Sequence, residues 1–325
     1  MPRGCIIYCA EKGQLEKYTI LSILSVKRFG GFLSQYDVFC FQPRKEFPVS
    51  AKTKKKLAEL NVVFIDKPLN TTHRYYSFAN KSIVCDYMAN TYDYDQYIFY
   101  DSDTLILDEP TEYINVNSDM LMCPVYTKGL GINESDNENN AYWFQLFKVF
   151  GILPRNLPTV ETAFEHEKIV AYWNAGIIVL NKRKEIFQRW NELLLQLLDQ
   201  RNYPPSGIFF VEQISLAITL IANDFTVRKL PQEYNFPLDQ RILNTGTTWK
   251  FDAIKILHHL NNLHLLDESD FVNSGNLKIQ WVKEKIIELG IQPKNPWQKI
   301  HLRILQVVKE FKERLYYFIF KFTHL

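Results

Sequence analysis

Short runs of β-branched and aromatic residues alternate along the chain with longer stretches in which apolar residues recur at helical spacing. Such alternation is typical of a mostly parallel sheet, because each strand is followed by a helix that crosses back over the sheet. The pattern therefore predicts an α/β fold with a nucleotide-binding half in the first 108 residues. In this half the predicted strands are 5–9, 36–41, 62–65 and 96–100, and the predicted helices lie near 15–29, 53–60 and 76–90.

The regular pattern stops after Pro110 and resumes at Trp173. Between these points the run 133–140 is polar enough to form a mobile loop, which is either a lid or a plain surface insertion. Beyond Trp173 the predicted strands are 175–180, 226–229 and 253–257, and the predicted helices lie near 184–201 and 211–222.

Composition indicates a folded protein with no general affinity for polyanions. An apolar fraction of 46% over 325 residues can fill a sizeable core. The 38 basic and 36 acidic residues leave a net charge of +2, so the whole-molecule field does not attract nucleic acid, and we expect none as a partner.

The cysteines and the N-terminus favour a cytoplasmic location. The five cysteines are widely spread and include no Cys-x-x-Cys pair, which is typical of small buried side chains in a reducing compartment. The apolar stretch 5–10 is too short for a signal peptide, and no run reaches the roughly 18 apolar residues of a transmembrane helix.

Two aspartates at the end of the fourth predicted strand are the strongest chemical signal. Asp101 and Asp103 come directly after the apolar residues 97–100, whereas a second pair, Asp93 and Asp95, precedes them. Ligands of open α/β sheets bind beyond the carboxyl ends of strands, so only Asp101 and Asp103 are placed for chemistry. Both can hold one hard cation, which leaves room for phosphate oxygens. Such a cation neutralises a diphosphate leaving group. A solvated turn with a capping aspartate is the alternative.

Two other families with paired aspartates fit less well. Haloacid-dehalogenase phosphatases place a threonine one residue later than Thr104 and carry the motif on the first strand. An EF-hand loop requires a glycine and a distal glutamate that are missing at the required spacing here.

A histidine at the end of a later predicted strand is a candidate third ligand. His258 could supply a nitrogen opposite the two carboxylates, and this mixed oxygen and nitrogen set suits manganese, or magnesium, better than calcium. His259 is the alternative ligand. Side chains alternate between the faces of a strand, so only one of the two can face the metal.

Five segments in order resemble one enzyme family. The segment 97–107, Tyr-Ile-Phe-Tyr-Asp-Ser-Asp-Thr-Leu-Ile-Leu, resembles the metal-binding segment of A-type-fold glycosyltransferases, in particular the glycogenin and bacterial lipopolysaccharide hexosyltransferase family, glycosyltransferase family 8. Four further segments resemble that family, namely 173–181 with Asn174, Ala175 and Gly176, the pair Glu212 and Gln213, the Leu-Pro-x-x-Tyr-Asn segment 230–235, and 254–258.

The resemblance implies a metal-dependent hexosyltransferase that uses a nucleotide diphosphate sugar, a UDP-sugar above all, and retains the anomeric configuration. Its acceptor is then a saccharide or a lipid-linked saccharide. A non-catalytic sugar-nucleotide or glycan-binding protein is the alternative from another class, and a nucleotidyltransferase is disfavoured because no Gly-rich phosphate loop follows the first strand. The expected domains are a catalytic domain, 1–274, with a nucleotide-binding half, 1–108, and a half for donor sugar and acceptor, 109–274, followed by a helical extension, 275–325.

The resemblance also implies roles for individual residues. Asn174 and Gly176 line the donor-sugar and acceptor site, where a missing Cβ allows close approach to the backbone. Glu212 and Gln213 join Asn174 as candidate catalytic residues, although a carboxylate at a helix start also favours the helix dipole. Lys81 is a candidate for binding the donor phosphates, and a solvated surface charge is the alternative for it.

The remaining candidates concern the nucleotide. The family's lysine after the histidine is missing from its place in this sequence, so Lys81 is the candidate for the donor phosphates. Cys9 and Ala10 are expected near the base by fold analogy. Ser102 lies between the two aspartates and counts with them as cofactor-binding.

The C-terminal residues predict a basic amphipathic helix. Asn295 and Pro296 resemble a helix start, and apolar residues then recur at helical spacing between Trp297 and Phe322. Cations outnumber acidic residues along it, so we expect peripheral contact with the cytoplasmic membrane face through 296–325. Packing on the catalytic domain or on a second subunit is the alternative.

Overall fold

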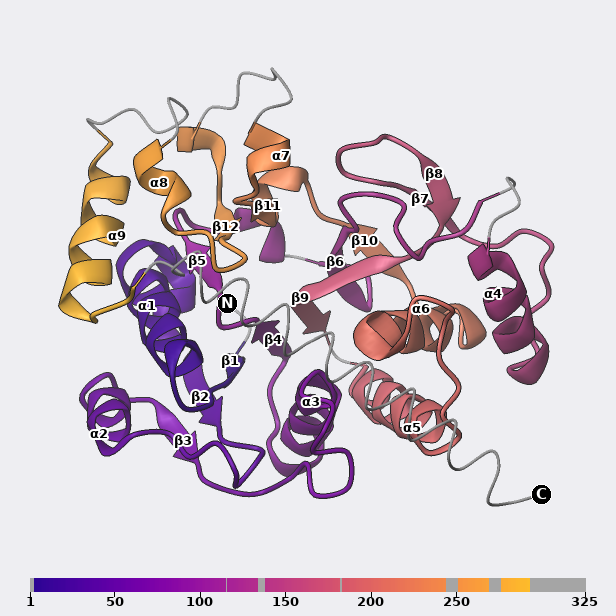
Figure 1. Ribbon diagram of the computed structural model, residues 1–325, viewed down its shortest axis with the longest axis horizontal. Coiled ribbons are helices and arrows are strands. Elements are labelled where there is room, and N and C mark those ends of the chain that lie inside the picture. The colour runs from indigo at the N-terminus through magenta and orange to yellow at the C-terminus, as the bar shows by residue number, and fades with distance from the viewer. Residues whose placement is uncertain are drawn as a thin grey trace.

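The fold is built on one large sheet. The computed structural model describes residues 3–114, 116–133, 138–181, 183–243, 251–268 and 276–292. Within them a seven-stranded sheet has the order β10-β6-β9-β4-β1-β2-β3 (Figure 1). Its strands are β1 Gly4–Cys9, β2 Asp37–Phe41, β3 Val63–Ile65, β4 Gln96–Tyr100, β6 Met120–Pro124, β9 Trp173–Asn181 and β10 Val227–Lys229.

The sheet is mostly parallel, as predicted. Strands β3, β2, β1 and β4 run parallel, β6 and β10 pair in parallel, and β9 runs antiparallel to both β4 and β6. The central strand β1 is apolar along its length because both of its faces are covered. The four strands predicted in the first half are confirmed to within one residue at each end.

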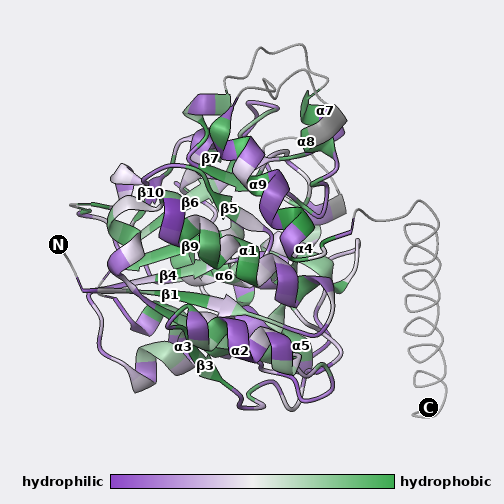
Figure 2. Ribbon diagram, turned by 90° about the vertical axis from the view of Figure 1, so that its left-hand side faces the viewer, coloured by the Kyte–Doolittle hydropathy of each residue, from purple (hydrophilic) through white to green (hydrophobic). Residues whose placement is uncertain are grey.

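Helices cover both faces of this sheet. Residues of α1 and α2 pack on one face, and residues of α3, α5 and α6 pack on the other. The outer faces of α2 and α3 are hydrophilic, whereas the central strands are hydrophobic (Figure 2). The helices are α1 Gln14–Phe29, α2 Ala51–Glu59, α3 Ala79–Thr91, α4 Glu138–Val149, α5 Glu185–Asp199, α6 Val211–Ala222, α7 Gln240–Leu243, α8 Leu265–Glu268 and α9 Leu277–Glu288.

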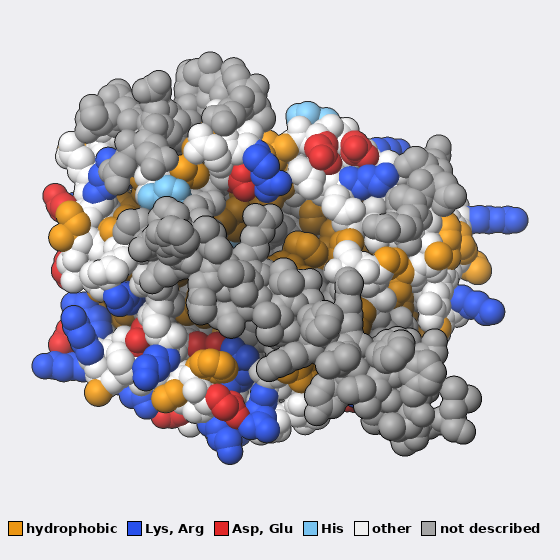
Figure 3. Space-filling view, in the orientation of Figure 1, with side chains coloured by type: hydrophobic (Ala, Val, Ile, Leu, Met, Phe, Trp, Pro, Cys, Tyr) orange, Lys and Arg blue, Asp and Glu red, His pale blue; other side chains and the backbone are white. Residues whose placement is uncertain are grey.

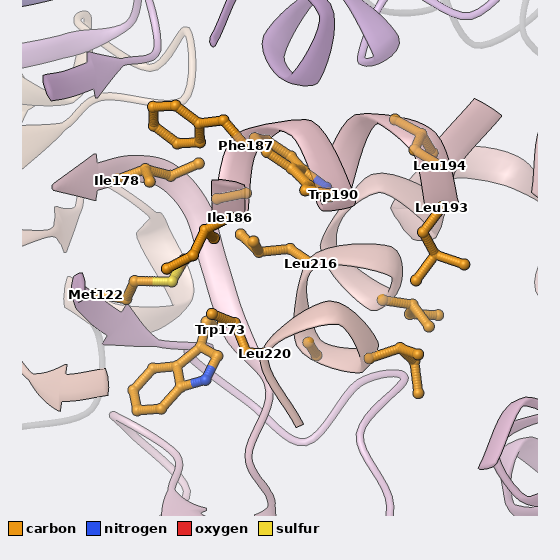
Figure 4. Packing of buried hydrophobic residues seen from close by; sticks show 14 of the residues in the cluster. Met122, Trp173, Ile178, Ile186, Phe187, Trp190, Leu193, Leu194, Leu216 and Leu220 are labelled. Carbon is orange, nitrogen blue, oxygen red and sulfur yellow. The ribbon is translucent and has the colours of Figure 1, made fainter. Parts of the chain in front are cut away.

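The packing of α5 and α6 against β9 holds the start of α6 in place. Phe187 and Trp190 of α5 are fully buried, next to Ile178 of β9 and Leu216 of α6 (Figure 4). Each such large apolar side chain contributes roughly 1.5–3 kcal/mol by leaving water. Trp190 also donates its indole N–H to Glu212 O at 2.9 Å, which fixes the start of α6.

A three-stranded sheet lies beyond the carboxyl end of β4. It has the order β11-β12-β5, with β5 Thr104–Ile106, β11 Phe236–Pro237 and β12 Ile256–His258. Strand β12 pairs antiparallel with β5, so that His258 lies opposite Thr104. This pairing brings a residue from late in the chain next to the turn that follows β4.

Between 104 and 172 the sequence pattern missed four of the strands that the structure describes, and part of the predicted loop is helical. Strands β5, β6, β7 Thr159–Glu161 and β8 Lys168–Val170 were not predicted. The strand β6 has no β-branched or aromatic residue, and the other three lie in a stretch without the regular alternation of strands and helices. Of the predicted loop 133–140, residues 138–140 form the first turn of α4, where Asn139 and Asn140 are buried, and 134–137 lie outside the described residues.

Later elements differ less from the prediction. The strand predicted at 253–257 begins at Ile256 and ends at His258. The predicted helix within 296–325 lies outside the described residues. In the described ranges, no helix has both the length and the apolar character needed to cross a bilayer.

Candidate active site

The turn after β4 presents two carboxylates at the carboxyl edge of the sheet. Asp101 N–H donates to Gly176 O at 2.8 Å, and Thr104 N–H donates to Asp101 O at 3.1 Å. Between them Ser102 is held on both sides, because its hydroxyl donates to Cys9 O at 2.7 Å and accepts from Thr19 Oγ1 at 3.0 Å. The turn is therefore fixed by β1, β9 and α1.

The other pair of aspartates lies away from this edge, at the start of β4. Asp93 forms an exposed ion pair with Lys184, and Asp95 accepts the backbone N–H of Arg3 at 2.9 Å. These contacts are surface contacts at the opposite end of the strand.

Asp101, Asp103 and His258 converge as a candidate metal-binding group. One ligand atom from each lies within 4.8 Å of the others. His258 Nε2 is 3.2 Å from Asp103 Oδ1. On the other side of the ring, Nδ1 lies 3.0 Å from Asn235 Oδ1 and 3.1 Å from the Tyr126 hydroxyl. When Nδ1–H donates to Asn235, Nε2 keeps its lone pair for a cation, the arrangement that orients metal-binding histidines.

Gly176 leaves open the space that these groups face. A Cβ there would lie 2.8 Å from His258 Cε1, 3.0 Å from Asn174 Oδ1 and 3.2 Å from Asp101 Oδ2. Asn174 Oδ1 accepts Gly176 N–H at 2.9 Å, which directs this amide along the strand. Two carboxylates, one imidazole and an open side fit a manganese or magnesium ion with positions left for phosphate oxygens.

His259, the alternative ligand, faces the other way. It is fully buried against the Tyr18 ring, with ring centroids 4.7 Å apart, and its Nδ1 accepts Asn261 N–H at 3.2 Å. Burial lowers the pKa of His259 to about 4, so its imidazole is neutral at physiological pH.

A buried lysine joins the candidate metal-binding group to α6. Lys81 Nζ is 2.8 Å from Asp101 Oδ2, 3.3 Å from Ala175 O and 3.8 Å from Glu212 Oε1. Glu212 is only 2% exposed, and its Oε2 accepts the hydroxyl of Tyr76 at 2.8 Å. With Glu212 ionised, Asp101, Asp103 and Glu212 oppose a single ammonium, which leaves a formal charge of −2 that a divalent cation would balance.

The electrostatic surroundings keep Asp103 and Lys81 charged. Burial opposes ionisation of Asp103, yet His258, His259 and Lys81 together hold the pKa of this carboxyl well below its usual range. Burial likewise disfavours charge on Lys81, but Asp101 and Glu212 raise its pKa above the ordinary value. The pKa of Glu212 is raised by burial despite the nearby Lys81.

A cavity of about 520 Å³ opens beside these residues. Gln213 lines it, and Gln213 Oε1 is buried with no hydrogen-bond partner among the described residues. Cys9 also lines the cavity, whereas Ala10 is fully buried and donates its N–H to Phe41 O at 2.8 Å. The structure thus brings together around one cavity every predicted site residue except the Ala10 side chain. The residues are Cys9, Lys81, Asp101, Ser102, Asp103, Asn174, Gly176, Glu212, Gln213 and His258.

Sequence reasoning missed other residues of the cavity. Glu11 lines it and forms a buried ion pair with Arg44, while Asn80 Nδ2 donates to Glu11 Oε1 at 3.0 Å. The position of Glu11 just beyond β1 is a signal that could have indicated it. Tyr126 follows a strand that was not predicted, so nothing in the sequence pointed to its contact with His258.

Comparisons with known proteins agree with this fold. A family model described as the Rhodobacterales glycosyltransferase domain matches residues 6–223 of the 325. No curated protein matches the sequence significantly. The galactosyltransferase LgtC, solved with donor and acceptor sugar analogues, is similar over 90% of this chain and 97% of its own, with 15% identity and a TM-score of 0.52.

A second solved structure is larger than this chain. The bifunctional glycosyltransferase WbbM, in its apo structure, is similar over 93% of this chain but 51% of its own, with 17% identity and a TM-score of 0.53. This chain therefore spans about half of WbbM. Both likenesses confirm the predicted A-type glycosyltransferase fold.

Proposed function

The chain belongs to the Rhodobacterales glycosyltransferase domain family, and we propose that it moves a hexose from a UDP-sugar to a saccharide or lipid-linked acceptor with the help of a divalent cation. The observation that carries this proposal is the convergence of Asp101, Asp103 and His258 at the carboxyl edge of the sheet. We place this reaction in a catalytic domain spanning 1–274. The five cysteines, all free thiols, support a cytoplasmic location.

Asp101, Asp103 and His258 would hold manganese or magnesium. When bound, the ion supplies positive charge to the diphosphate that leaves. Lys81 adds a second positive charge next to Asp101 and is our candidate for a donor phosphate oxygen. Ser102 fixes the turn between the two aspartates through its contacts with Cys9 and Thr19.

The donor sugar is then expected against Asn174, Gly176 and Gln213. The missing side chain of Gly176 lets the donor approach the strand, and the unpartnered oxygen of Gln213 can accept a sugar hydroxyl. Glu212 holds Lys81 and Tyr76 in place, so its proposed catalytic part is to position them. The base is expected near Cys9 and Glu11, at the end of β1.

The engagement of the carboxylates supports a retaining reaction. An inverting transfer needs a general base free to take the acceptor proton. In the described part of the chain, each carboxylate that lines the cavity already has a partner: Glu11 has Arg44, Asp101 has Lys81, Asp103 has His258 and Glu212 has Tyr76.

Release of nucleotide from a panel of UDP-, GDP- and ADP-hexoses, with manganese or with chelator, tests the proposal. We expect hydrolysis of a UDP-hexose with manganese, loss of it with chelator and recovery on adding metal back. No turnover of any donor, or turnover that chelator leaves unchanged, would contradict it.

The anomeric proton of the first sugar released, followed by NMR, tests retention. The anomer of the donor should appear first. The opposite anomer would replace the retaining reaction with an inverting one but leave the metal site in place.

A further inference from the structure

Helix α4 has an exposed face that is apolar and basic. Its buried side carries Tyr142, Trp143, Leu146 and Phe147, which pack into the core. At about 100° per residue, the exposed positions 141, 144, 145, 148 and 149 fall within an arc of about 140°. The helix is therefore amphipathic, but its outer side is not the charged surface that usually meets water.

Three large apolar side chains are exposed on this face and the turn after it. Phe144 is 47% exposed, Val149 is 56% exposed and Leu153 is 78% exposed. Isolated exposed apolar residues are ordinary, whereas a contiguous set indicates a contact surface. These three lie within ten positions of the sequence, 144–153.

The charges on the same segment are all positive. Between Glu138 and Glu161 the sequence has no acidic residue, and its only charged residues are Lys148 and Arg155, both exposed. No ion pair within the described part of the chain involves Lys148 or Arg155. Hydrophobic and basic side chains lie together at the right-hand edge of the molecule, where α4 is found (Figure 3).

We propose that Phe144, Lys148, Val149, Leu153 and Arg155, the α4 face, dock the protein on an anionic lipid bilayer. Phe144, Val149 and Leu153 enter the boundary between headgroups and acyl chains, and the two cations lie at the phosphate level. None of these five residues is acidic, and apolar side chains accompanied by cations match an anionic membrane. Glu161 and Asp224 lie outside the α4 face, on the lining of a cavity that Leu153 and Arg155 share.

Part of the α4 face lines a second cavity. Leu153 and Arg155 line a cavity of about 860 Å³, which Trp173 and Leu220 also line. Trp173 directly precedes Asn174 of the candidate site. Docking through the α4 face does not depend on the proposed function.

Co-sedimentation of the full chain with vesicles tests the proposal. The vesicles are phosphatidylcholine alone or with about one third phosphatidylglycerol, the lipid that supplies negative charge. We expect the unchanged protein to bind the anionic vesicles. A variant with Phe144→Ser, Val149→Ser and Leu153→Ser should bind them at least tenfold more weakly. The matched control, Leu277→Ser with Ile287→Ser, removes apolar side chains that are 78% and 80% exposed on α9 and should bind as the unchanged protein does.

The charge is tested separately with Lys148→Gln and Arg155→Gln. Removing both should weaken binding about 30-fold, because each near-surface cation contributes about 1 kcal/mol and 1.4 kcal/mol is a factor of ten. Lys52→Gln with Lys55→Gln, two exposed lysines of α2, is the matched control and should change binding less than threefold.

Three outcomes would overturn the proposal. They are no binding of the unchanged protein to anionic vesicles, equal binding by the serine variant, and a concentration-dependent dimer that the serine variant loses, which would make the α4 face an interface between copies. Donor hydrolysis measured without vesicles should be equal in all variants. If no variant and no unchanged protein hydrolyses a donor, the proposed function fails while the docking result stands.

Discussion

Replacing Gly176 by alanine is expected to damage the candidate metal site without unfolding the protein. The added Cβ would lie 2.8 Å from His258 Cε1 and 3.2 Å from Asp101 Oδ2. Non-bonded carbon atoms are comfortable at about 3.5–4.0 Å, so the imidazole must retreat by about 1 Å. Gly176 has an ordinary strand conformation, so alanine itself adopts the backbone without strain.

The size of the effect follows from that displacement. A shift of about 1 Å in a reacting group costs about 100-fold in rate, or about 2.7 kcal/mol. Metal-dependent UDP-hexose hydrolysis by Gly176→Ala should therefore fall about 100-fold in kcat/KM, and calorimetry should show manganese binding at least tenfold weaker. The cavity side of the imidazole can yield, so the thermal midpoint should fall by about 4 °C or less, the effect of about 1 kcal/mol.

A double-mutant cycle separates this steric explanation from general damage. His258→Ala removes the atom that the new Cβ would meet first, so Gly176→Ala should cost less than about threefold in manganese affinity in that background. Equal costs in both backgrounds would refute the reasoning, as would a single Gly176→Ala variant with unchanged affinity. The affinity measurement keeps the test informative when His258→Ala alone has lost hydrolysis.

Three further predictions concern the same region. Asp103→Asn should lower manganese-dependent hydrolysis by about 100-fold or more. Asp93→Asn should change the rate by no more than about twofold, because the Asp93 side chain is 94% exposed. Similar losses for both variants in steady-state kinetics would contradict the assignment of Asp103 to the metal site. Asn235→Leu should weaken manganese binding about 10–100-fold in calorimetry, because it removes the acceptor that orients His258, and wild-type affinity would refute that role. In metal-free protein, the pKa of His259 is about 4 in the folded state and about 6.5 in the unfolded state. The contribution of His259 to the free energy of unfolding is therefore complete above about pH 6.5. It is lost as the pH falls toward 4, by about 3 kcal/mol in total. Urea unfolding should show that His259→Phe removes this part of the pH dependence, and parallel curves for the two proteins would contradict it.

The elements and residues that were predicted correctly depend on local patterns. The strand 96–100 is buried throughout and apolar or aromatic from residue 97 on, and its end alone places Asp101 and Asp103 at the ligand-binding edge of the sheet. The prediction of helix α6 at 211–222 likewise depends on one uninterrupted stretch of periodic apolar residues. In such places a window of ten residues contains the information that decides the structure.

The residues that were missed depend on contacts between distant segments. Tyr126 meets His258 across 132 positions of the sequence, and Glu11 meets Arg44 across 33. Neither pairing leaves a periodic trace, because each is decided by how loops from different strands meet at one edge. The strand β6 that carries the chain toward Tyr126 reads Met-Leu-Met-Cys-Pro, without the β-branched or aromatic residues by which the other strands were recognised.

The choice between the two histidines shows how sequence and structure divide the problem. Strand alternation requires that only one of His258 and His259 face the metal, but it leaves open which one. The pairing of β12 with β5 decides it, since His258 lies opposite Thr104 and His259 N–H donates to Asp103 O at 2.9 Å. A slip of one residue would turn His259 toward the carboxylates and His258 into the space beside Tyr18. Because the backbone bond from His259 itself fixes this register, His259 helps to hold Asp103, and through it the candidate metal-binding group, in position.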